Sequence, residues 1–229
     1  MAACRGKSFI ITIDGPAGSG KSTTARRVAE RLGYSYLDSG ALYRAVTWAA
    51  LQQNIDLQDS ERVARLAEQL DLVFQAGEEG LRILVNGRDV SREIRMPEVT
   101  QAIAPVAANS GVRYALLDTQ RRFGKQGGVV AEGRDMGTVV FPDADVKFFM
   151  VASLQERAER RQAELAAKGV AVPLEELKRS LQQRDDSDRQ RAHSPLRRPQ
   201  EAIDIDTSRL SIDEQVDLVI REVLKKLNA

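Results

Sequence analysis

The stretch IDGPAGSGKSTT, residues 13–24, contains the pattern G-x-x-x-x-G-K-[ST] with every fixed position matched. A short run of apolar and β-branched residues at 8–14 precedes it, and an amphipathic segment at 22–33 follows it. In such a strand–loop–helix unit, the glycines let backbone N–H groups point at phosphate oxygens, and the helix adds its positive end. The sequence therefore predicts a phosphate-binding loop in an α/β protein.

The residues of this loop have separate expected roles in binding a nucleotide. Lys21 is expected to reach the β- and γ-phosphates, and Ser22 is expected to be a ligand of Mg²⁺. Arginines on a helical segment near residue 160 are expected to contact phosphates from a mobile arm. The predicted donor-nucleotide site consists of Gly15, Pro16, Ala17, Gly18, Ser19, Gly20, Lys21, Ser22, Thr23, Arg157 and Arg161.

Two missing patterns narrow the class of phosphate-loop protein. No asparagine starts the N-K-x-D motif of a guanine reader, and no apolar strand ends in the plain Asp-Glu pair of a motor protein. Small kinases therefore remain the leading class.

Composition and charge indicate a soluble globular protein. The chain of 229 residues is 42% hydrophobic and 29% charged, and its 34 basic and 33 acidic residues give a net charge of +1. This balance favours neither nucleic acid nor a membrane as a partner. The one cysteine, Cys4, cannot form a disulfide within the chain, and the sequence begins with no signal peptide. We expect a cytoplasmic monomer.

Strand-like and helix-like segments alternate along most of the chain. This alternation predicts an α/β fold with a parallel five-stranded sheet flanked by helices. The spacing of the apolar residues changes at 71–91, where runs of β-forming residues are separated by glycine turns. This pattern predicts small antiparallel strands inserted into the core domain. Two segments that begin with Ser153 and Ser211 carry a Glu three residues later, and we expect both to start helices with a capping box. Pro105 interrupts an otherwise helical segment.

Two charged turns stand at the ends of predicted strands. LDSGALYRA (37–45) places Asp38 and Ser39 at one strand end, and EGRDMGT (132–138) places an Arg-Asp pair at another. Ligands of open α/β sheets bind beyond the carboxyl ends of the strands. An Arg beside an Asp can also be a purely structural ion pair, and that alternative stays open.

The run QQRDDSDRQR (182–191) predicts a second group of charged side chains. If this run is helical, Arg184, Asp188 and Arg191 share one face. A solvated helix face is the usual meaning of such a run. However, the apolar period lapses here and the loop PLRRP (195–199) follows, which favours a helical lid. A triphosphate and a phosphorylated acceptor bring about six negative charges, which one lysine and one Mg²⁺ do not balance.

Two other functions compete with a kinase acting on a phosphate group. A kinase for a small hydroxyl compound would need a general base, and Asp38 could serve as one. A nucleic-acid binder could use the arginines of 157–198, but the overall charge neutrality and the few aromatic residues argue against it.

Four motifs together resemble the family of bacterial-type cytidylate kinases. They are ITIDGPAGSGKST (11–23), LDSGALYRA (37–45), EGRDMGTVVFPDA (132–144) and RDDSDR (184–189), and the likeness runs from about residue 9 to the C-terminus. Glu132 stands where the family more often has Asp. The resemblance implies ATP-dependent phosphorylation of CMP and dCMP with Mg²⁺. It also implies one nucleoside-monophosphate-kinase domain over 1–229, with a monophosphate-binding insertion at about 59–108 and a lid at about 155–192.

The resemblance also implies a role for each residue of the acceptor site. The expected readers of the cytosine edge are Ser39, Arg113 and Asp135. The expected ligands of the sugar are Arg184 and Asp188. The expected ligands of the acceptor phosphate are Arg44, Arg134 and Arg191. The expected catalytic residues are Lys21, Arg134, Arg184 and Arg191. A carboxylate such as that of Asp135 can accept a hydrogen bond from the N4 amino group of cytosine, whereas uracil presents a carbonyl there. His193 has no assigned role.

Overall fold

The computed structural model describes residues 8–77, 80–167 and 169–227, so Cys4 lies outside the described residues. The chain forms two compact units. We call Met1–Leu37 together with Gln126–Ala229 the loop unit, and Asp38–Lys125 the helical unit.

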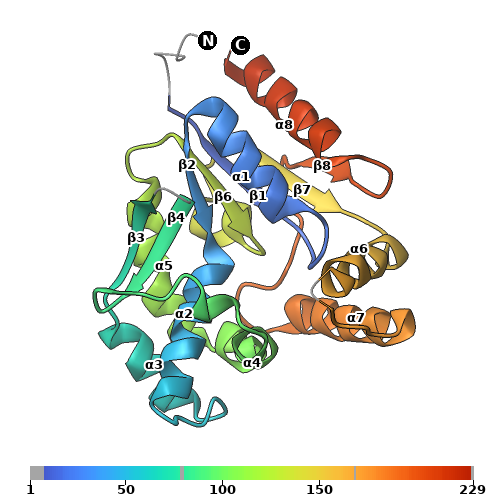
Figure 1. Ribbon diagram of the computed structural model, residues 1–229. Helices are drawn as coiled ribbons and strands as arrows, with labels where there is room; N and C mark the ends of the chain where they lie inside the picture. Colours follow the sequence, from blue (N-terminus) through green and yellow to red (C-terminus); the bar gives the residue numbers. More distant parts are fainter. Residues whose placement is uncertain (1–7, 78–79, 168, 228–229) are drawn as a thin grey trace. The chain divides into compact units, whose positions relative to one another are not determined.

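A five-stranded sheet is the centre of the loop unit (Figure 1). Its strands are β1 (Ile10–Asp14), β2 (Ser35–Asp38), β6 (Val129–Gly133), β7 (Val146–Val151) and β8 (Ile203–Asp206). They lie in the order β2-β6-β1-β7-β8, and β1 pairs in parallel with β6 on one side and with β7 on the other. The apolar, β-branched residues of β1 and β6 suit strands that are covered on both faces. The predicted five-stranded parallel sheet is confirmed.

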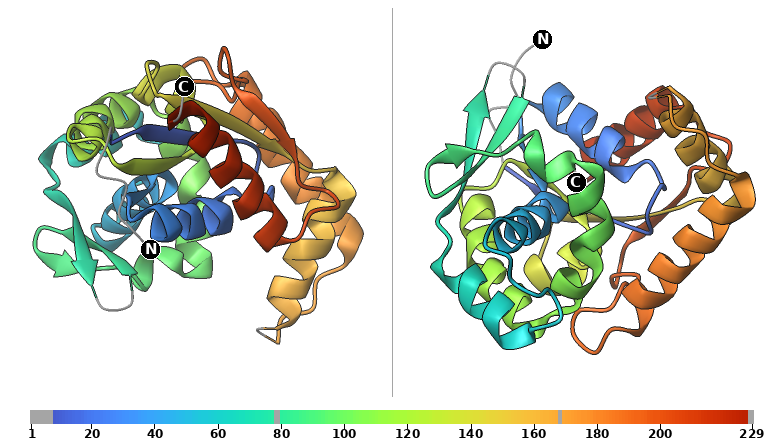
Figure 2. Two further views of the ribbon diagram at one scale, coloured as in Figure 1. Left: turned by 90° about the horizontal axis from the view of Figure 1, so that it is seen from above. Right: turned by 60° about the horizontal axis from the view of Figure 1, so that its bottom comes forward.

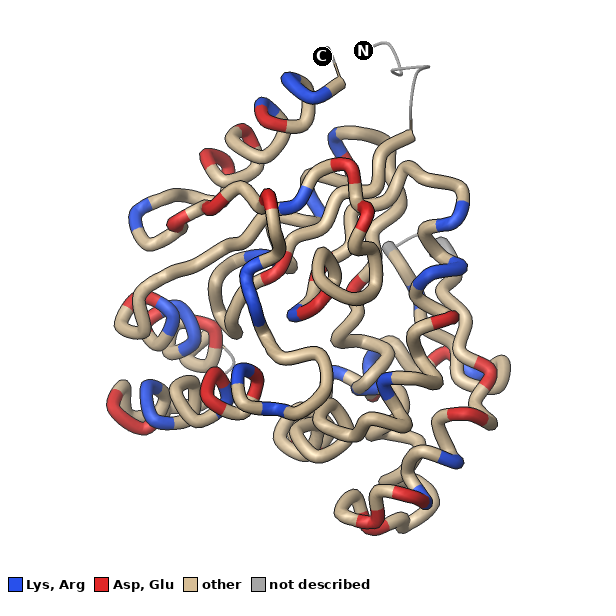
Figure 3. The backbone as a smooth tube through the Cα atoms, turned by 180° about the vertical axis from the view of Figure 1, so that it is seen from behind, with Lys and Arg blue, Asp and Glu red and all other residues tan. Residues whose placement is uncertain are grey.

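Four helices belong to the loop unit: α1 (Lys21–Leu32), α6 (Leu154–Ala166), α7 (Leu174–Gln190) and α8 (Ile212–Leu227). Helices α1 and α8 lie side by side on one face of the sheet (Figures 1 and 2). Val28 of α1 and Val219 of α8 share a core with Phe148 of β7, and all three are 0% exposed. Helices α6 and α7 pack against each other, and acidic and basic residues are interspersed along both (Figure 3). The capping box predicted at Ser211 is formed, since its hydroxyl accepts the N–H of Glu214 and its own N–H donates to the Glu214 carboxylate. At α6 the Ser153 hydroxyl accepts the N–H of Glu156, but the N–H of Ser153 donates to the Ser208 hydroxyl, so the second box is incomplete.

The helical unit contains α2 (Ser39–Gln52), α3 (Ser60–Gln69), β3 (Leu72–Gly77), β4 (Gly80–Val85), β5 (Arg88–Asp89), the 3₁₀ turn Glu93–Arg95, α4 (Pro97–Ala108) and α5 (Ser110–Gly124). The strands form an antiparallel sheet in the order β3-β4-β5, as the sequence predicts for 71–91. Leu42, Val46 and Leu116 lie in a core made only of residues of this unit. The unit begins at Asp38, well before 59, because the apolar face of α2 belongs to that core.

One local prediction was wrong. Pro105 does not interrupt α4, which continues to Ala108, because Ile103 and Val106 beside it are buried in the core of the helical unit and this packing outweighs the lost N–H donor. The predicted polar turn after β6, at Arg134 and Asp135, leads into a π-helical turn, Met136–Val140. Among the described residues, no helix has the length and hydropathy that a membrane span requires.

Candidate active site

The phosphate loop connects β1 to α1 along a path that only glycine fits at both ends. Gly15 has φ of 157°, and a Cβ there would lie 2.1 Å from the carbonyl oxygen of Met150. Gly20 has φ of 88°, and a Cβ there would lie 2.8 Å from Gln215 Oε1. The loop therefore packs closely against β7 and α8, and the two glycines of the motif are required by contact as well as by φ.

Lys21 is the first residue of α1 and is 5% exposed. Its Nζ donates to the carbonyl oxygen of Pro16 at 3.0 Å. Burial, together with the positive charges of Arg134 and Arg184, lowers the pKa of Lys21 to about 7. A buried cation among other cations is costly unless an anion joins it, so this position favours the binding of phosphate.

Ser22 and Glu132 place two hard oxygen atoms beside Lys21. The Ser22 hydroxyl donates to Glu132 Oε1 at 2.6 Å. Glu132 is buried and lies near the end of strand β6. Among the described residues, no group of three or more His, Cys, Asp or Glu side chains could hold a metal ion. One hydroxyl and one carboxylate fit Mg²⁺, which usually keeps water ligands and binds through one or two carboxylates and the phosphates of a substrate.

Asp188 of α7 forms ion pairs with two arginines, Arg134 directly after β6 and Arg191 directly after α7. The Asp188 carboxylate accepts from Arg134 Nε at 2.6 Å and lies 3.5 Å from Arg191 Nη1. Burial alone would raise the pKa of Asp188, but the guanidinium groups of Arg134, Arg191 and Arg184 outweigh burial and lower it. The same carboxylate raises the pKa of Arg134 against the effect of burial. Three of the residues predicted to be catalytic, Arg134, Arg184 and Arg191, thus lie around Asp188. The fourth, Lys21, lies near the same carboxylate.

The two arginines predicted to contact the donor from α6 differ in their surroundings. Arg157 is buried: it donates to the carbonyl oxygen of Ala17 at 2.9 Å and pairs with Asp185 at 2.7 Å. Its guanidinium therefore joins the phosphate loop to α7 in this structure. Arg161 lies on the surface of α6 and pairs with Glu164 at 3.0 Å.

Asp135 directly follows Arg134 in the loop unit and is buried, and the other three acceptor residues, Ser39, Arg44 and Arg113, belong to the helical unit. Asp38 caps α2 by accepting the N–H of Ala41 at 3.0 Å, and its other oxygen accepts from Arg44 at 2.7 Å. Ser39 is the first residue of α2 and is buried. The Arg113 guanidinium donates to the carbonyl oxygen of Ala107 and lies 5.1 Å from the ring centre of Tyr43, one turn after Ser39. Both oxygens of Asp38 have structural bonds, which argues against its use as a general base.

Comparison with known proteins identifies the family of the chain. The profile of the cytidylate kinase family matches residues 11–225. The chain belongs to the cytidylate kinase family. It is 46% identical over 227 residues to the cytidylate kinase of Geobacter sp. (strain M21), a match that covers 99% of this chain and 97% of that protein.

Membership of the cytidylate kinase family extends to longer proteins. The chain is 51% identical over 220 residues to the bifunctional pantoate ligase/cytidylate kinase of Synechococcus sp. (strain JA-3-3Ab). That match covers 95% of this chain, which spans 41% of the length of the bifunctional relative. Among solved structures, a gluconokinase from Sinorhizobium meliloti 1021 is similar, with a TM-score of 0.49, 15% identity, and coverage of 96% of this chain and 94% of that chain.

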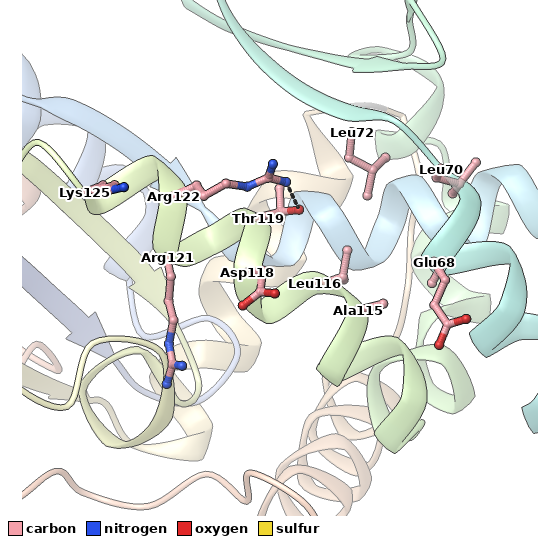
Figure 4. Close-up of a pocket in the computed structure, with 11 residues that line it drawn as sticks. Glu68, Leu70, Leu72, Ala115, Leu116, Asp118, Thr119, Arg121, Arg122 and Lys125 are labelled. Atoms are coloured by element: carbon pink, nitrogen blue, oxygen red, sulfur yellow. Dashed lines mark hydrogen bonds between the residues drawn. The ribbon is translucent and has the colours of Figure 1, made fainter.

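A pocket of about 600 Å³ lies in the helical unit (Figure 4). Leu70, Leu72 and Leu116 provide apolar surface, and acidic and basic side chains of α3 and α5 surround it. None of the predicted nucleotide-binding residues lines this pocket.

Three residues with structural importance for the site were missed or undervalued in the sequence. Glu132 reads as a minor departure from the family pattern, yet it contacts Ser22 directly. Asp185 is 1% exposed, but it lies in a charged run of the sequence that gives no indication of this burial. Asp14 stands directly before the first loop glycine, and this position at a strand end is the only signal that could have identified it.

Proposed function

We propose that this member of the cytidylate kinase family transfers the γ-phosphoryl group of ATP to CMP and dCMP, giving CDP and dCDP. The observation that carries the proposal is the cluster of Lys21, Arg134, Arg184 and Arg191 around one carboxylate beside the phosphate loop. Fixed cations of this kind match a reaction in which two anionic groups must approach each other.

An acceptor phosphate is already ionised, so the reaction needs no general base. The structural bonds of both Asp38 oxygens support a phosphate acceptor over a hydroxyl acceptor. Catalysis then consists of alignment and of charge stabilisation by Lys21 and the arginines. Asp188 keeps Arg134 and Arg191 in place, and it is also the proposed acceptor for the sugar hydroxyls.

Mg²⁺ is part of the proposal because Ser22 and Glu132 fit it. When bound, the ion would neutralise charge on the donor phosphates. Among the acceptor residues, Asp135 is proposed to accept from the N4 amino group of cytosine, while Ser39, Arg44 and Arg113 keep the roles that the resemblance implies. We also propose a monomer in the cytoplasm, and the lack of any cysteine pair supports a reducing compartment.

A coupled assay of ADP release tests the function directly. With ATP and Mg²⁺, CMP and dCMP should support rapid release, and UMP and AMP should support much slower release. Lys21→Ala is the control for the site, and its turnover should fall at least about a hundredfold because a transition-state charge contact is lost. Release that does not depend on a nucleoside monophosphate, or full activity in Lys21→Ala, would contradict the proposal.

A further inference from the structure

Asp14 is a buried carboxylate that the proposed chemistry does not use. It is the last residue of β1 and is 0% exposed. Its Oδ1 accepts the backbone N–H of Met136 at 2.8 Å, and its Oδ2 accepts the N–H of Gly137 at 2.7 Å. Both oxygens are therefore directed at the start of one turn, 122 residues away in the sequence.

That turn directly follows the Arg134-Asp135 pair. It spans Met136–Val140, and the N–H groups of Val139 and Val140 donate to the carbonyl oxygen of Asp135 at 2.9 and 3.1 Å. The first N–H groups of any helical turn have no acceptor within the turn, and the side chain of the preceding residue usually caps them. Asp135 makes no such cap bond. The capping bonds come from Asp14, on a neighbouring strand.

Close packing fixes the turn on its other sides. A Cβ on Gly137 would lie 2.9 Å from Thr12 Oγ1, on β1, and 2.9 Å from Cγ of Pro199. The turn therefore sits between β1 and the segment that carries Pro199, with no room for a methyl group. Its position depends on the two hydrogen bonds to Asp14 and on this close contact.

We propose that Asp14 is a positioning residue for the nucleobase specificity of the reaction. By capping the turn from β1, it sets the place of Asp135 and Arg134 relative to the phosphate loop, which begins at the next residue, Gly15. The inference rests on the proposed function, because it assigns Asp135 to the recognition of cytosine.

The cost of burying Asp14 supports a role beyond stability. Burial raises the pKa of Asp14 to about 7, although the N–H groups of Gly137 and Met136 oppose the rise. Only the ionised carboxylate accepts on both oxygens without carrying a proton of its own. A buried charged group is weak evidence for stability, since an uncharged side chain is cheaper to bury.

Asp14→Asn tests the inference, because an amide has only one acceptor oxygen. Its NH₂ group, which is a donor, would lie against one of the two backbone N–H groups, so one capping bond would be lost. We expect kcat/KM for CMP to fall about tenfold or more, from misplacement of the base-reading turn. The ratio of kcat/KM for CMP over UMP should fall by about the same factor, while KM for ATP should change less than about twofold. A merely structural role would not move that ratio.

Asp145→Asn is the matched control. Asp145 accepts one N–H, that of Ile10 at 2.8 Å, at the opposite end of β1, and an amide oxygen can still accept it. The variant therefore makes the same chemical change beside the same strand without placing a donor against a second N–H group. This variant should keep the parent selectivity. If Asp14→Asn does not fold, Gly137→Ala answers the question, because its methyl group displaces the same turn and should lower the same ratio.

The outcomes separate this inference from the function on which it rests. A parent enzyme that does not phosphorylate CMP overturns both. An active parent, with an unchanged CMP-over-UMP ratio in folded Asp14→Asn or in Gly137→Ala, overturns only the positioning role of Asp14.

Discussion

Single residues of the site carry charges in places where water cannot stabilise them, and Lys21 is the clearest case. Its pKa of about 7 in the folded protein lies below the ordinary value of 10.5, mainly because it is buried. Between pH 7 and pH 10.5 the unfolded chain therefore binds more protons than the folded one. The free energy of unfolding that depends on Lys21 must rise with pH across this window.

Lys21→Met should remove this pH dependence. We expect the parent, without nucleotide, to gain stability relative to the variant as the pH rises from about 7 to about 10. Urea unfolding at several pH values measures the difference, with Lys226→Met, a substitution of an exposed lysine on α8, as the control. Parent and Lys21→Met curves that stay parallel over this range would contradict the burial of the charge.

Under the proposed function, the choice of base depends on Asp135. Asp135→Ala should abolish the discrimination between CMP and UMP, because the acceptor for the N4 amino group is lost while the phosphate ligands stay. The measurement is kcat/KM for both nucleotides under one set of conditions. Unchanged selectivity in a folded variant would refute the role of Asp135.

Motifs of the sequence led to predictions for single residues of the site but could not predict all of their contacts. The spacing of the loop leads to the choice of Lys21 and Ser22 because each fixed position has a chemical reason. The partners of Arg157 could not be predicted, since a helical pattern does not reveal which arginine turns inward toward Ala17 and Asp185. Asp14 was missed because its partners lie on a turn far along the chain.

At the scale of elements, the pair α6 and α7 depends on a buried ion pair. Arg157 and Asp185 have side chains that are 5% and 1% exposed, and Arg157 also reaches the phosphate loop. Removing one member leaves the other charged and buried, which is far more costly than removing both.

Asp185→Ala should therefore lower the free energy of unfolding by about 3 kcal/mol or more. The double variant Arg157→Leu/Asp185→Leu should recover much of that loss. Asp186→Ala, at the next position of α7, is the control and should cost far less, because Asp186 is only partly buried. Denaturant unfolding measures all three, and equal losses for Asp185→Ala and Asp186→Ala would contradict this account.

Secondary structure could be predicted well where a pattern was long and periodic. Strand β1 and helix α8 fall where their apolar periods place them. The turn Met136–Val140 could not be predicted, because its residues carry no π-helical signal and its first N–H groups donate to Asp14, far away in the sequence. Helix α4 passes through Pro105 because tertiary packing outweighs a local preference.

At the scale of the whole molecule, the chain has two separate hydrophobic cores. The core of the helical unit contains Leu42 and Val63, and the core of the loop unit contains Phe148 and Val219. The sequence predicted an insertion but not where its unit begins, because the helical pattern of α2 does not say which core it joins.

Leu42→Ala should weaken the helical unit without equal effect on the loop unit. Such a substitution in a core costs about 2–5 kcal/mol, which corresponds to an equilibrium constant for opening that is at least roughly 30-fold larger. Hydrogen exchange should accelerate by this factor within 38–125 and much less elsewhere. Val219→Ala is the reciprocal control, and equal acceleration throughout the chain in both variants would contradict two separately stabilised units.

The central claim is that the γ-phosphoryl group of ATP moves to the phosphate of CMP. The ³¹P NMR spectrum of the purified product of ATP and CMP tests it most directly. The account predicts two mutually coupled phosphorus signals, as in a nucleoside diphosphate. Two uncoupled monoester signals, which would place the new phosphate on a sugar hydroxyl, or inorganic phosphate with unchanged CMP, would contradict the account.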